Sequence, residues 1–121
     1  CYSQSRNIDY PDELTTEEGK AFIDDLAAFG APVILFSGGE PTIRRDLFEL
    51  ADYARQKGMR AVISTNGTLI TKDVAKRLRD IGLSYVGVSL DGMKETNDKF
   101  RRVTGAFDAA LRGIRNCKEE G

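Results

Sequence analysis

The sequence contains no histidine among its 121 residues. Without an imidazole, this chain has no Ser–His or Cys–His nucleophilic pair and no zinc site built on histidine. Acid–base chemistry in this chain therefore has to come from carboxylates, lysine, tyrosine or a cofactor.

Cysteine is also scarce, since only Cys1 and Cys117 are present. Two cysteines do not make a disulfide framework for a domain of this size, so a reducing, cytoplasmic setting is expected. Cys117 falls late in the last expected helix. There, a small and partly buried hydrophobe is a simpler interpretation than a metal ligand.

Long apolar runs and an excess of one charge are lacking too. No run approaches the ~18–20 apolar residues that span a bilayer. The 18 basic and 19 acidic residues leave a net charge of −1, which gives no reason to expect nucleic acid or an anionic membrane as a partner. The chain starts at Cys1 without a signal-peptide pattern, and this start suggests an excerpt from a longer protein.

What the sequence does contain is a regular alternation of helix and strand signals. Thr15 and Glu18 have the spacing of a capping box, and Gly30 is a suitable helix stop. Asp46 and Thr71 are expected to cap two further helices. The expected elements are helices over 15–29, 46–57, 71–81 and 107–118, strands over 33–37, 60–65 and 85–90, and a polar connection over 93–105.

This order predicts an α/β fold in one domain, with parallel strands joined by right-handed crossovers. Three strands do not close a barrel, so the chain is either a slice of an α/β barrel or a small open sheet. The apolar run 33–36 is typical of a strand covered on both faces. The last helix is expected to bury a face made of Phe107, Ala110, Leu111 and Ile114.

A polar segment rich in glycine follows each expected strand. These segments read Ser-Gly-Gly-Glu at 37–40, Ser-Thr-Asn-Gly at 64–67 and Ser-Leu-Asp-Gly at 89–92. Paired glycines let a backbone approach a ligand closely, and Glu40 adds a carboxylate suited to an amine. Each segment alone is compatible with an ordinary turn. Because the carboxyl ends of parallel strands meet at one end of the fold, the three together predict a shared polar ligand site.

In this order and spacing, the segments resemble those of the radical S-adenosylmethionine (radical SAM) enzymes. The resemblance rests on Gly-Gly-Glu-Pro at 38–41, Ser-Thr-Asn-Gly at 64–67 and Val-Ser-Leu-Asp-Gly at 88–92, and it covers essentially all of the chain. It implies a partial (βα)6 barrel of the TIM type. It also implies a [4Fe–4S] cluster, held by three cysteines in a C-x3-C-x2-C loop, and S-adenosylmethionine. In that family the cluster cleaves S-adenosylmethionine reductively and yields a 5′-deoxyadenosyl radical that abstracts a substrate hydrogen.

The resemblance also assigns roles to single residues. Cys1 matches the last cysteine of the cluster loop. The resemblance implies that the backbone groups of the paired glycines face the amino group of S-adenosylmethionine and that Glu40 orders that region. It also implies that the hydroxyls of Thr65 and Ser89 contact the ribose or the carboxylate of this ligand. The residues assigned to cofactor binding are Gly38, Gly39, Glu40, Thr65, Asn66, Ser89, Asp91 and Arg101, and the metal ligand is Cys1.

Arg101 belongs to a segment, 97–107, that resembles a family stretch often reading His-Asp-x-x-Arg-Gly-x-x-Gly-x-Phe. Arg101 is a candidate carboxylate partner, because a guanidinium binds carboxylates through two hydrogen bonds. Two positions depart from the family pattern: Asn97 replaces the usual histidine and Arg102 replaces a usual glycine. The basic pair at 44–45 is read as a surface pair, with a substrate carboxylate as the alternative partner.

Parts that the family needs for cluster binding and for a complete barrel are expected to lie outside residues 1–121. Two of the cluster cysteines would precede Cys1, and the fifth and sixth barrel strands would follow Gly121. Residues 1–121 are therefore predicted to be one partial radical SAM core domain that is inert and free of a cluster by itself.

Within the family, residues 1–5 and 9–11 resemble members that modify tetrapyrroles in heme or heme d1 biosynthesis. That resemblance implies a small-molecule substrate and an electron donor as partners. Peptide-modifying or sulfatase-maturing radical SAM enzymes remain alternatives, as does a non-catalytic α/β ligand-binding module.

Overall fold

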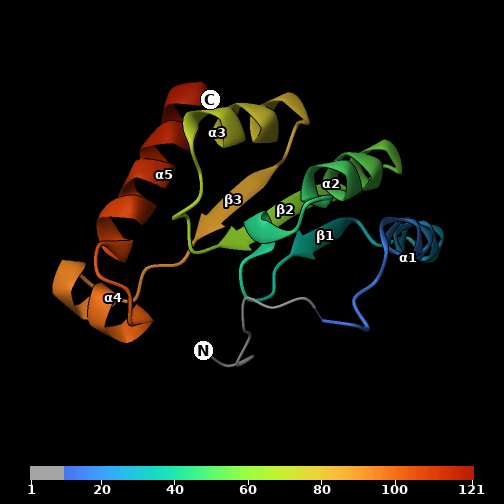
Figure 1. Cartoon of the computed structure of the whole chain (residues 1–121). Coiled ribbons are helices and arrows are strands. Elements are labelled where there is room, and N and C mark those ends of the chain that lie inside the picture. The colour runs from blue at the N-terminus through green and yellow to red at the C-terminus, as the bar shows by residue number, and fades with distance from the viewer. Residues whose placement is uncertain (1–9) are drawn as a thin grey trace.

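The structure is a computed structural model that describes residues 10–121. Helices and strands alternate along the chain (Figure 1). The N-terminal segment and Cys1 lie outside the described residues. The elements are α1 (Thr16–Phe29), β1 (Val33–Phe36), the 3-10 turn η1 (Pro41–Ile43), α2 (Leu47–Gln56), β2 (Arg60–Thr65), α3 (Lys72–Asp80), β3 (Tyr85–Val88), α4 (Lys94–Arg101) and α5 (Ala106–Glu120).

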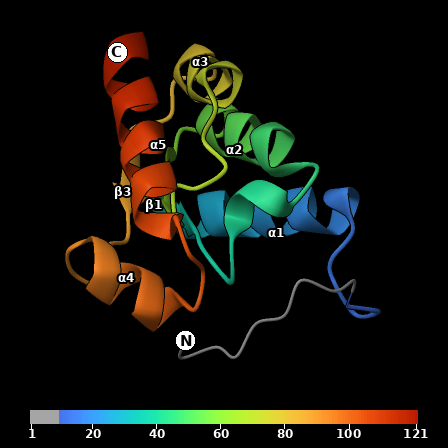
Figure 2. The same ribbon diagram turned by 60° about the vertical axis from the view of Figure 1, so that its left-hand side comes forward.

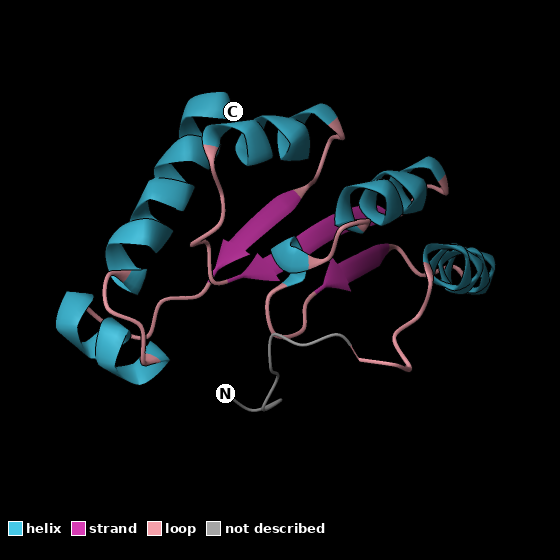
Figure 3. Ribbon diagram, in the orientation of Figure 1, coloured by secondary structure: helices cyan, strands magenta, loops and turns pink. Residues whose placement is uncertain are grey.

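The three strands form one parallel sheet in the order β1-β2-β3, which confirms the predicted α/β fold (Figure 3). Both crossover helices pack on the same face of this sheet. Leu47 of α2 and Leu78 of α3 meet around Ile63 of β2 in a single buried cluster. Sequential strands with their helices on one side are the arrangement of a barrel wall, because a doubly wound sheet carries helices on both faces.

The opposite face of the sheet is open in residues 10–121, so the expectation that β1 is covered on both faces is wrong for this chain. Leu35, Val62 and Tyr85 lie side by side across the three strands. Leu35 is 57% exposed and Tyr85 is 64% exposed. In a barrel this is the face that points inward.

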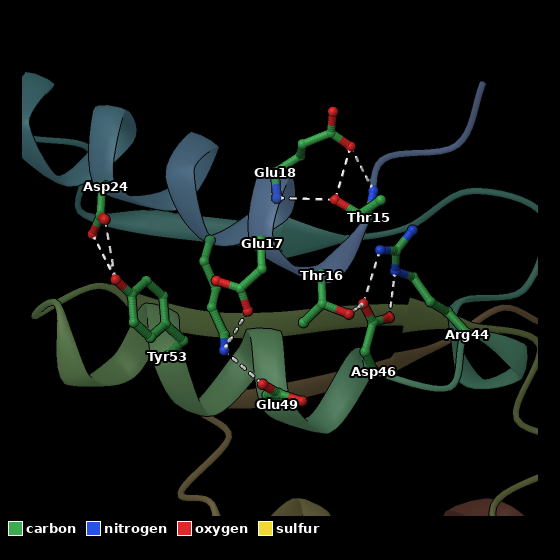
Figure 4. Close-up of polar contacts among 10 residues, drawn as sticks. Thr15, Thr16, Glu17, Glu18, Asp24, Arg44, Asp46, Glu49 and Tyr53 are labelled. Carbon is green, nitrogen blue, oxygen red and sulfur yellow. Dashed lines mark hydrogen bonds and ion pairs between the residues drawn. The ribbon is translucent and has the colours of Figure 1, made fainter.

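Local signals explain where α1 begins and ends. Glu18 N donates to the Thr15 hydroxyl at 3.3 Å, and Thr15 N donates to the Glu18 carboxylate at 2.8 Å, which makes the predicted capping box (Figure 4). Gly30 then adopts a left-handed conformation with φ 86°. The helix therefore begins and ends where the sequence predicts.

Polar contacts hold α1 against α2 at the outer surface (Figure 4). The Tyr53 hydroxyl donates to the Asp24 carboxylate at 3.0 Å, and the Lys20 ammonium lies 2.6 Å from the Glu49 carboxylate. Beneath them, Ile23 and Leu50 belong to an apolar cluster that includes residues of β1. The two helices therefore support the strand that leads to the first glycine-rich segment.

The last two helices differ from the sequence expectation. The expected polar connection contains α4, which buries only Asn97 and so has no apolar stripe to reveal it. Helix α5 buries Ala110 as expected, together with Ala106 and Gly113, whereas Phe107 and Leu111 are only half-buried and Ile114 is exposed. Its small residues face inward because α5 packs closely against the loop after β2.

Two smaller expectations also change. Strand β3 ends at Val88 rather than at Leu90. Asp46 stands at the start of α2, but its side chain makes no capping hydrogen bond. Among residues 10–121, no helix is both long and apolar enough to cross a bilayer.

Candidate functional site

The three polar segments lie at the same end of the sheet, where the arrowheads of β1, β2 and β3 point (Figure 1). Glu40 follows β1 and stands at the start of the turn η1. Asn66 follows β2, and Ser89 follows β3, where its backbone N–H donates to Thr65 O at 3.0 Å. Parallel pairing therefore brings residues that are distant in the sequence to one edge.

The Glu40 carboxylate is the centre of this edge. Its Oε1 atom accepts hydrogen bonds from the backbone and hydroxyl of Thr42, and from the Thr65 hydroxyl at 2.6 Å. Its Oε2 atom accepts the backbone N–H of Asn66 at 2.7 Å. Glu40 thus ties the end of β1 to the end of β2. Its oxygens are engaged inside the protein, so it orders the site and is not a free partner for an amine.

Thr65 is buried and serves the same network. Its hydroxyl donates to Glu40 and accepts the Gly67 N–H at 3.0 Å. These contacts use the hydroxyl proton and one of the two acceptor positions of the oxygen. The structure places Thr65 behind the strand ends, as a residue that positions Glu40.

Asn66 shapes the loop after β2. Its side-chain oxygen accepts the backbone N–H of Thr68 at 2.8 Å and the hydroxyl of Thr68 at 2.7 Å. This local turn is typical of asparagine and leaves the Asn66 backbone N–H directed to Glu40. These contacts are local to the loop after β2, and the cofactor-binding role assigned to Asn66 stays a prediction.

The same loop packs tightly against β3 and α5 through two glycines. Gly67 has φ 74°, and a Cβ atom there would lie 2.6 Å from Val88 Cγ1. A Cβ atom on Gly113 would lie 2.2 Å from the carbonyl oxygen of Gly67. Neither position has space for a side chain, so α5 fixes the loop that carries Asn66.

Gly38 and Gly39 are exposed at the end of β1, with Gly38 at φ 126° and open space around it. Among residues 10–121, no hydrogen bond engages their backbone N–H or carbonyl groups. Unpaired backbone groups beside an ordered carboxylate suit a ligand with an ammonium and a carboxylate group. The chemistry of this segment therefore fits the amino-acid end of S-adenosylmethionine.

The end of β3 is held by α4. Asp91 N donates to the side-chain oxygen of Asn97 at 3.0 Å, and the Arg101 guanidinium forms an ion pair with the Asp91 carboxylate. Arg101 therefore binds a carboxylate of its own chain. Ser89 is exposed, and its hydroxyl makes no hydrogen bond within the described part of the chain.

Asn97 is a site residue that sequence reasoning did not assign. Its side chain is only 2% exposed, and it contacts the backbone at the end of β3. The one available signal was its departure from the usual histidine of the family stretch. That departure draws attention to position 97, but it does not reveal the hydrogen bond between Asn97 and the backbone of Asp91.

Asp98 fixes the corner between α4 and α5. Its carboxylate accepts the backbone N–H groups of Phe107 at 2.8 Å and of Gly105 at 2.7 Å. These two bonds hold the pKa of the Asp98 carboxyl below its usual range. Gly105, the residue before α5, has no side chain for this purpose, so Asp98 supplies the cap from a distance.

A groove of about 1210 Å³ runs beside β1 and opens at the glycine segment. It is lined by both apolar and polar groups. They include Phe22, Leu35, Ser37, Gly38, Gly39 and Arg45.

Arg44 lies at the wall of this groove but is engaged within the protein (Figure 4). Its guanidinium lies 2.6 Å from Asp46 and 2.9 Å from Glu13, and Thr16 donates to Asp46 at 2.7 Å. Burial raises the pKa of the Asp46 carboxyl, but the bonds from Arg44 and Thr16 outweigh burial and hold that pKa below its usual range. Of the basic pair, only Arg45 is exposed.

The described residues do not form a site for an iron–sulfur cluster. Within residues 10–121, no group of three or more His, Cys, Asp or Glu side chains is placed to hold a metal. Cys117 is a half-buried thiol on α5, and burial raises its pKa. A thiol with a raised pKa is a poor metal ligand, which agrees with its reading as a small apolar residue. The assigned ligand Cys1 lies outside the described residues.

Comparison with known proteins identifies one family model and several similar curated proteins. The family model of the Radical SAM superfamily matches residues 1–121. The chain is 73% identical over its full length to the Fe-coproporphyrin III synthase of Methanosarcina barkeri, of which it covers 30%. It is 45% identical over its full length to the pre-heme d1 synthase of Dinoroseobacter shibae, again covering 30%. The mycofactocin maturase MftC of Mycobacterium tuberculosis is 42% identical over 122 residues, with 31% covered.

The fold has counterparts among solved structures. The structure described as native anSMEcpe with bound AdoMet and Cp18Cys peptide superposes with a TM-score of 0.73 at 25% identity, over 99% of this chain and 35% of that one. A second structure, native anSMEcpe with bound AdoMet, gives a TM-score of 0.75 at 24% identity and covers 36% of that chain.

This chain spans about 30% of the length of the curated relatives named above. The match to the family model nevertheless extends over the whole chain and includes all three segments of the resemblance. The family implies a [4Fe–4S] cluster and S-adenosylmethionine as cofactors. The chain belongs to the radical SAM superfamily.

Proposed function

We propose that this chain is the cofactor-positioning part of a radical SAM enzyme that modifies a tetrapyrrole. The observation that carries the proposal is the Glu40 network. It ties the ends of β1 and β2 together, while the backbone groups of Gly38 and Gly39 are exposed and make no hydrogen bond with residues 10–121. The 73% identity to an Fe-coproporphyrin III synthase supports a tetrapyrrole as the substrate.

In this proposal, the carbonyl oxygens of Gly38 and Gly39 accept hydrogen bonds from the ammonium group of S-adenosylmethionine. Glu40 does not contact the ligand; it holds the glycine segment in place before the ligand arrives, so little ordering is needed on binding. The exposed Ser89 hydroxyl is available to the carboxylate or ribose of the same ligand. With both cofactors bound, the cluster would supply the electron and S-adenosylmethionine the radical that takes a hydrogen atom from the substrate.

Cys1 is proposed as one thiolate ligand of the cluster, on the segment that leads into α1. In this proposal, two further cysteines and an electron donor, as the family uses them, would complete the cluster site of the enzyme. The cytoplasmic location expected from the scarcity of cysteine remains a prediction.

The test uses the full-length protein, purified and reconstituted without oxygen. It is supplied with S-adenosylmethionine, a chemical reductant and an iron-containing siroheme-derived tetrapyrrole. We expect 5′-deoxyadenosine to form in proportion to a tetrapyrrole product of lower mass. Absence of any tetrapyrrole product, with the cluster loaded, contradicts the proposed substrate.

A peptide substrate is the second candidate. It is favoured by the 42% identity to a mycofactocin maturase and by the fold shared with a structure that holds a peptide. The same assay distinguishes the two, because a peptide enzyme forms 5′-deoxyadenosine with peptide and leaves the tetrapyrrole unchanged.

A further inference from the structure

Two polar side chains are buried in the described part of the chain, and both serve strand ends of the candidate site. Thr65 is 3% exposed and Asn97 is 2% exposed. Burying a polar group costs free energy unless the group is hydrogen-bonded, so each of them needs a partner. Thr65 binds Glu40 and supports the ends of β1 and β2. Asn97, on α4, binds the backbone of Asp91 after β3.

The segment 89–92 connects β3 to α4 and belongs to neither element. Its start is fixed because Ser89 N donates to the carbonyl oxygen of the last residue of β2 at 3.0 Å. Two residues further on, Asp91 N donates to the side-chain oxygen of Asn97 at 3.0 Å. Gly92 then turns the chain with φ 140°, a conformation that suits glycine. Asn97 is therefore the side chain that holds the backbone of this segment at Asp91.

Helix α4 is itself fixed to the rest of the fold. Figures 1 and 2 place α4 beside the first turns of α5, next to the segment that leaves β3. The Asp98 carboxylate accepts two backbone N–H groups around the start of α5 at 2.7 and 2.8 Å. The Lys94 ammonium lies 2.6 Å from the Asp108 carboxylate of α5. The buried amide on α4 therefore has a fixed base from which it holds the segment 89–92.

The chemistry of this contact explains the residue at position 97. The Asp91 N–H needs an acceptor, and the side-chain oxygen of Asn97 supplies it. A neutral histidine, the usual residue of the family stretch at this position, has a ring nitrogen at the same number of bonds from the backbone, and this nitrogen also accepts a hydrogen bond. The departure from the family pattern therefore keeps an acceptor at the same place.

We propose that Asn97 is a positioning residue for S-adenosylmethionine, which holds the Ser89 hydroxyl where the carboxylate or ribose of the ligand needs it. This inference rests on the proposed function and adds to it a residue that acts from α4 without touching the ligand. Ser89 is exposed, and its hydroxyl makes no hydrogen bond with residues 10–121. A segment that is already held in place loses little conformational freedom when the ligand binds.

The test measures the Kd of S-adenosylmethionine by equilibrium dialysis against the full-length protein, reconstituted with its cluster without oxygen. Asn97→Leu removes the acceptor and keeps a similar shape, and we expect the Kd to rise about tenfold because the segment has to be ordered on binding. Asn97→His restores an acceptor and is expected to stay within about threefold of the wild type. Amide hydrogen exchange at Asp91 is expected to be faster in Asn97→Leu. Asn97→Ala removes the acceptor without adding volume and replaces the leucine variant if that variant does not fold.

Two further measurements distinguish positioning from a general loss of structure. In Asn97→Leu, the KM for S-adenosylmethionine is expected to rise while kcat at saturation is retained. In a Ser89→Ala background, Asn97→Leu is expected to have little further effect on the Kd, because its effect is transmitted through the Ser89 hydroxyl. Lys94→Ala is the matched control on α4: it removes a contact with α5 but none with the segment 89–92, and it is expected to leave the Kd unchanged.

The outcomes separate this inference from the proposed function. If the wild type binds S-adenosylmethionine and a folded Asn97→Leu protein binds it equally well, the inference is wrong and the proposed function stands. The inference is also wrong if Asn97→Leu acts equally in the wild-type and Ser89→Ala backgrounds, or if Lys94→Ala raises the Kd as much. If the wild type with a loaded cluster does not bind S-adenosylmethionine, the proposed function itself fails.

Discussion

At the scale of single residues, the Glu40 carboxylate accepts an unusually large number of hydrogen bonds. It accepts four hydrogen bonds, from Thr42, Thr65 and Asn66, and donates none. Only an ionised carboxylate offers this many acceptor sites on one short side chain. The hydrogen bonds with Thr42, Thr65 and Asn66 therefore require a glutamate at position 40, whether or not a ligand also contacts it.

Replacing Glu40 by glutamine tests whether these four hydrogen bonds require a carboxylate. The amide keeps the shape but turns one acceptor oxygen into a donor, so at least one of the four partners faces a donor. We expect Glu40→Gln to lower the free energy of unfolding by about 1–3 kcal/mol, the cost of leaving a buried donor unsatisfied. The measurement is denaturant unfolding of the full-length protein, together with amide hydrogen exchange over residues 65–68.

Glu95→Gln is the matched control for this change, because Glu95 is exposed on α4 and makes no ion pair in the described structure. It is expected to leave both measurements unchanged. Equal protection of residues 65–68 in Glu40→Gln and the wild type would mean that the network does not order the loop.

The sequence predicted which residues gather at the strand ends, because the residues that follow parallel strands must meet there. It did not predict how they pair with one another. Thr65 binds Glu40 and Arg101 pairs with the Asp91 carboxylate, two contacts that the sequence did not indicate, while the ligand roles assigned to both residues stay predictions. Polar residues at one edge compete for the same partners, and only their positions in space decide which pairs form.

At the scale of elements, the predicted helices were those with an apolar stripe or a clear cap. Helix α4 has neither: its only buried residue is Asn97, and no side chain caps its first turn. It is held by polar contacts with residues far along the chain, which periodicity does not register. Helix α5 was predicted in place, and its predicted face is correct at Ala110 but not at Ile114, which is exposed, because the close contact of α5 with the loop after β2 requires small residues.

The contact between α5 and the loop after β2 leads to a prediction for Gly113. In isolation, alanine favours a helix over glycine by roughly 1 kcal/mol. Here the added Cβ atom would lie 2.2 Å from the carbonyl oxygen of Gly67, which is backbone and cannot rotate away. We expect Gly113→Ala to destabilise the full-length protein by about 1–3 kcal/mol, measured by thermal and denaturant unfolding.

Gly19→Ala in α1 is the control, since its Cβ atom would lie 3.1 Å from the end of the flexible Leu50 side chain. Because that side chain adjusts more easily than backbone, we expect a smaller effect. A Gly113→Ala protein as stable as the wild type would show that α5 does not fix this loop.

At the scale of the whole molecule, the sequence left open whether the chain is a slice of a barrel or a small open sheet. The structure favours the barrel, because the helices share one face and Leu35 and Tyr85 remain exposed on the other. Strand alternation alone does not distinguish these cases, since both have parallel strands with right-handed crossovers. The side on which each crossover packs is decided by contacts such as that of Leu47 with Ile63 and Leu78.

The incomplete barrel also limits the chemistry of residues 1–121 taken alone. One thiolate does not hold a [4Fe–4S] cluster, and Cys117 is a half-buried thiol of raised pKa on α5. We therefore expect anaerobic reconstitution of residues 1–121 to give no stoichiometric cluster. Iron and sulfide analysis and the charge-transfer absorbance measure this, and circular dichroism confirms that the chain is folded.

In the full-length protein, Cys1→Ser is expected to abolish the stable cluster, because it removes one of the three thiolate ligands that the family uses. Cys117→Ser is the control and is expected to retain the cluster, since its thiol serves packing on α5. A stable cluster in Cys1→Ser would contradict the assignment of Cys1 as a cluster ligand, and loss of the cluster in Cys117→Ser without loss of fold would contradict the packing role of Cys117.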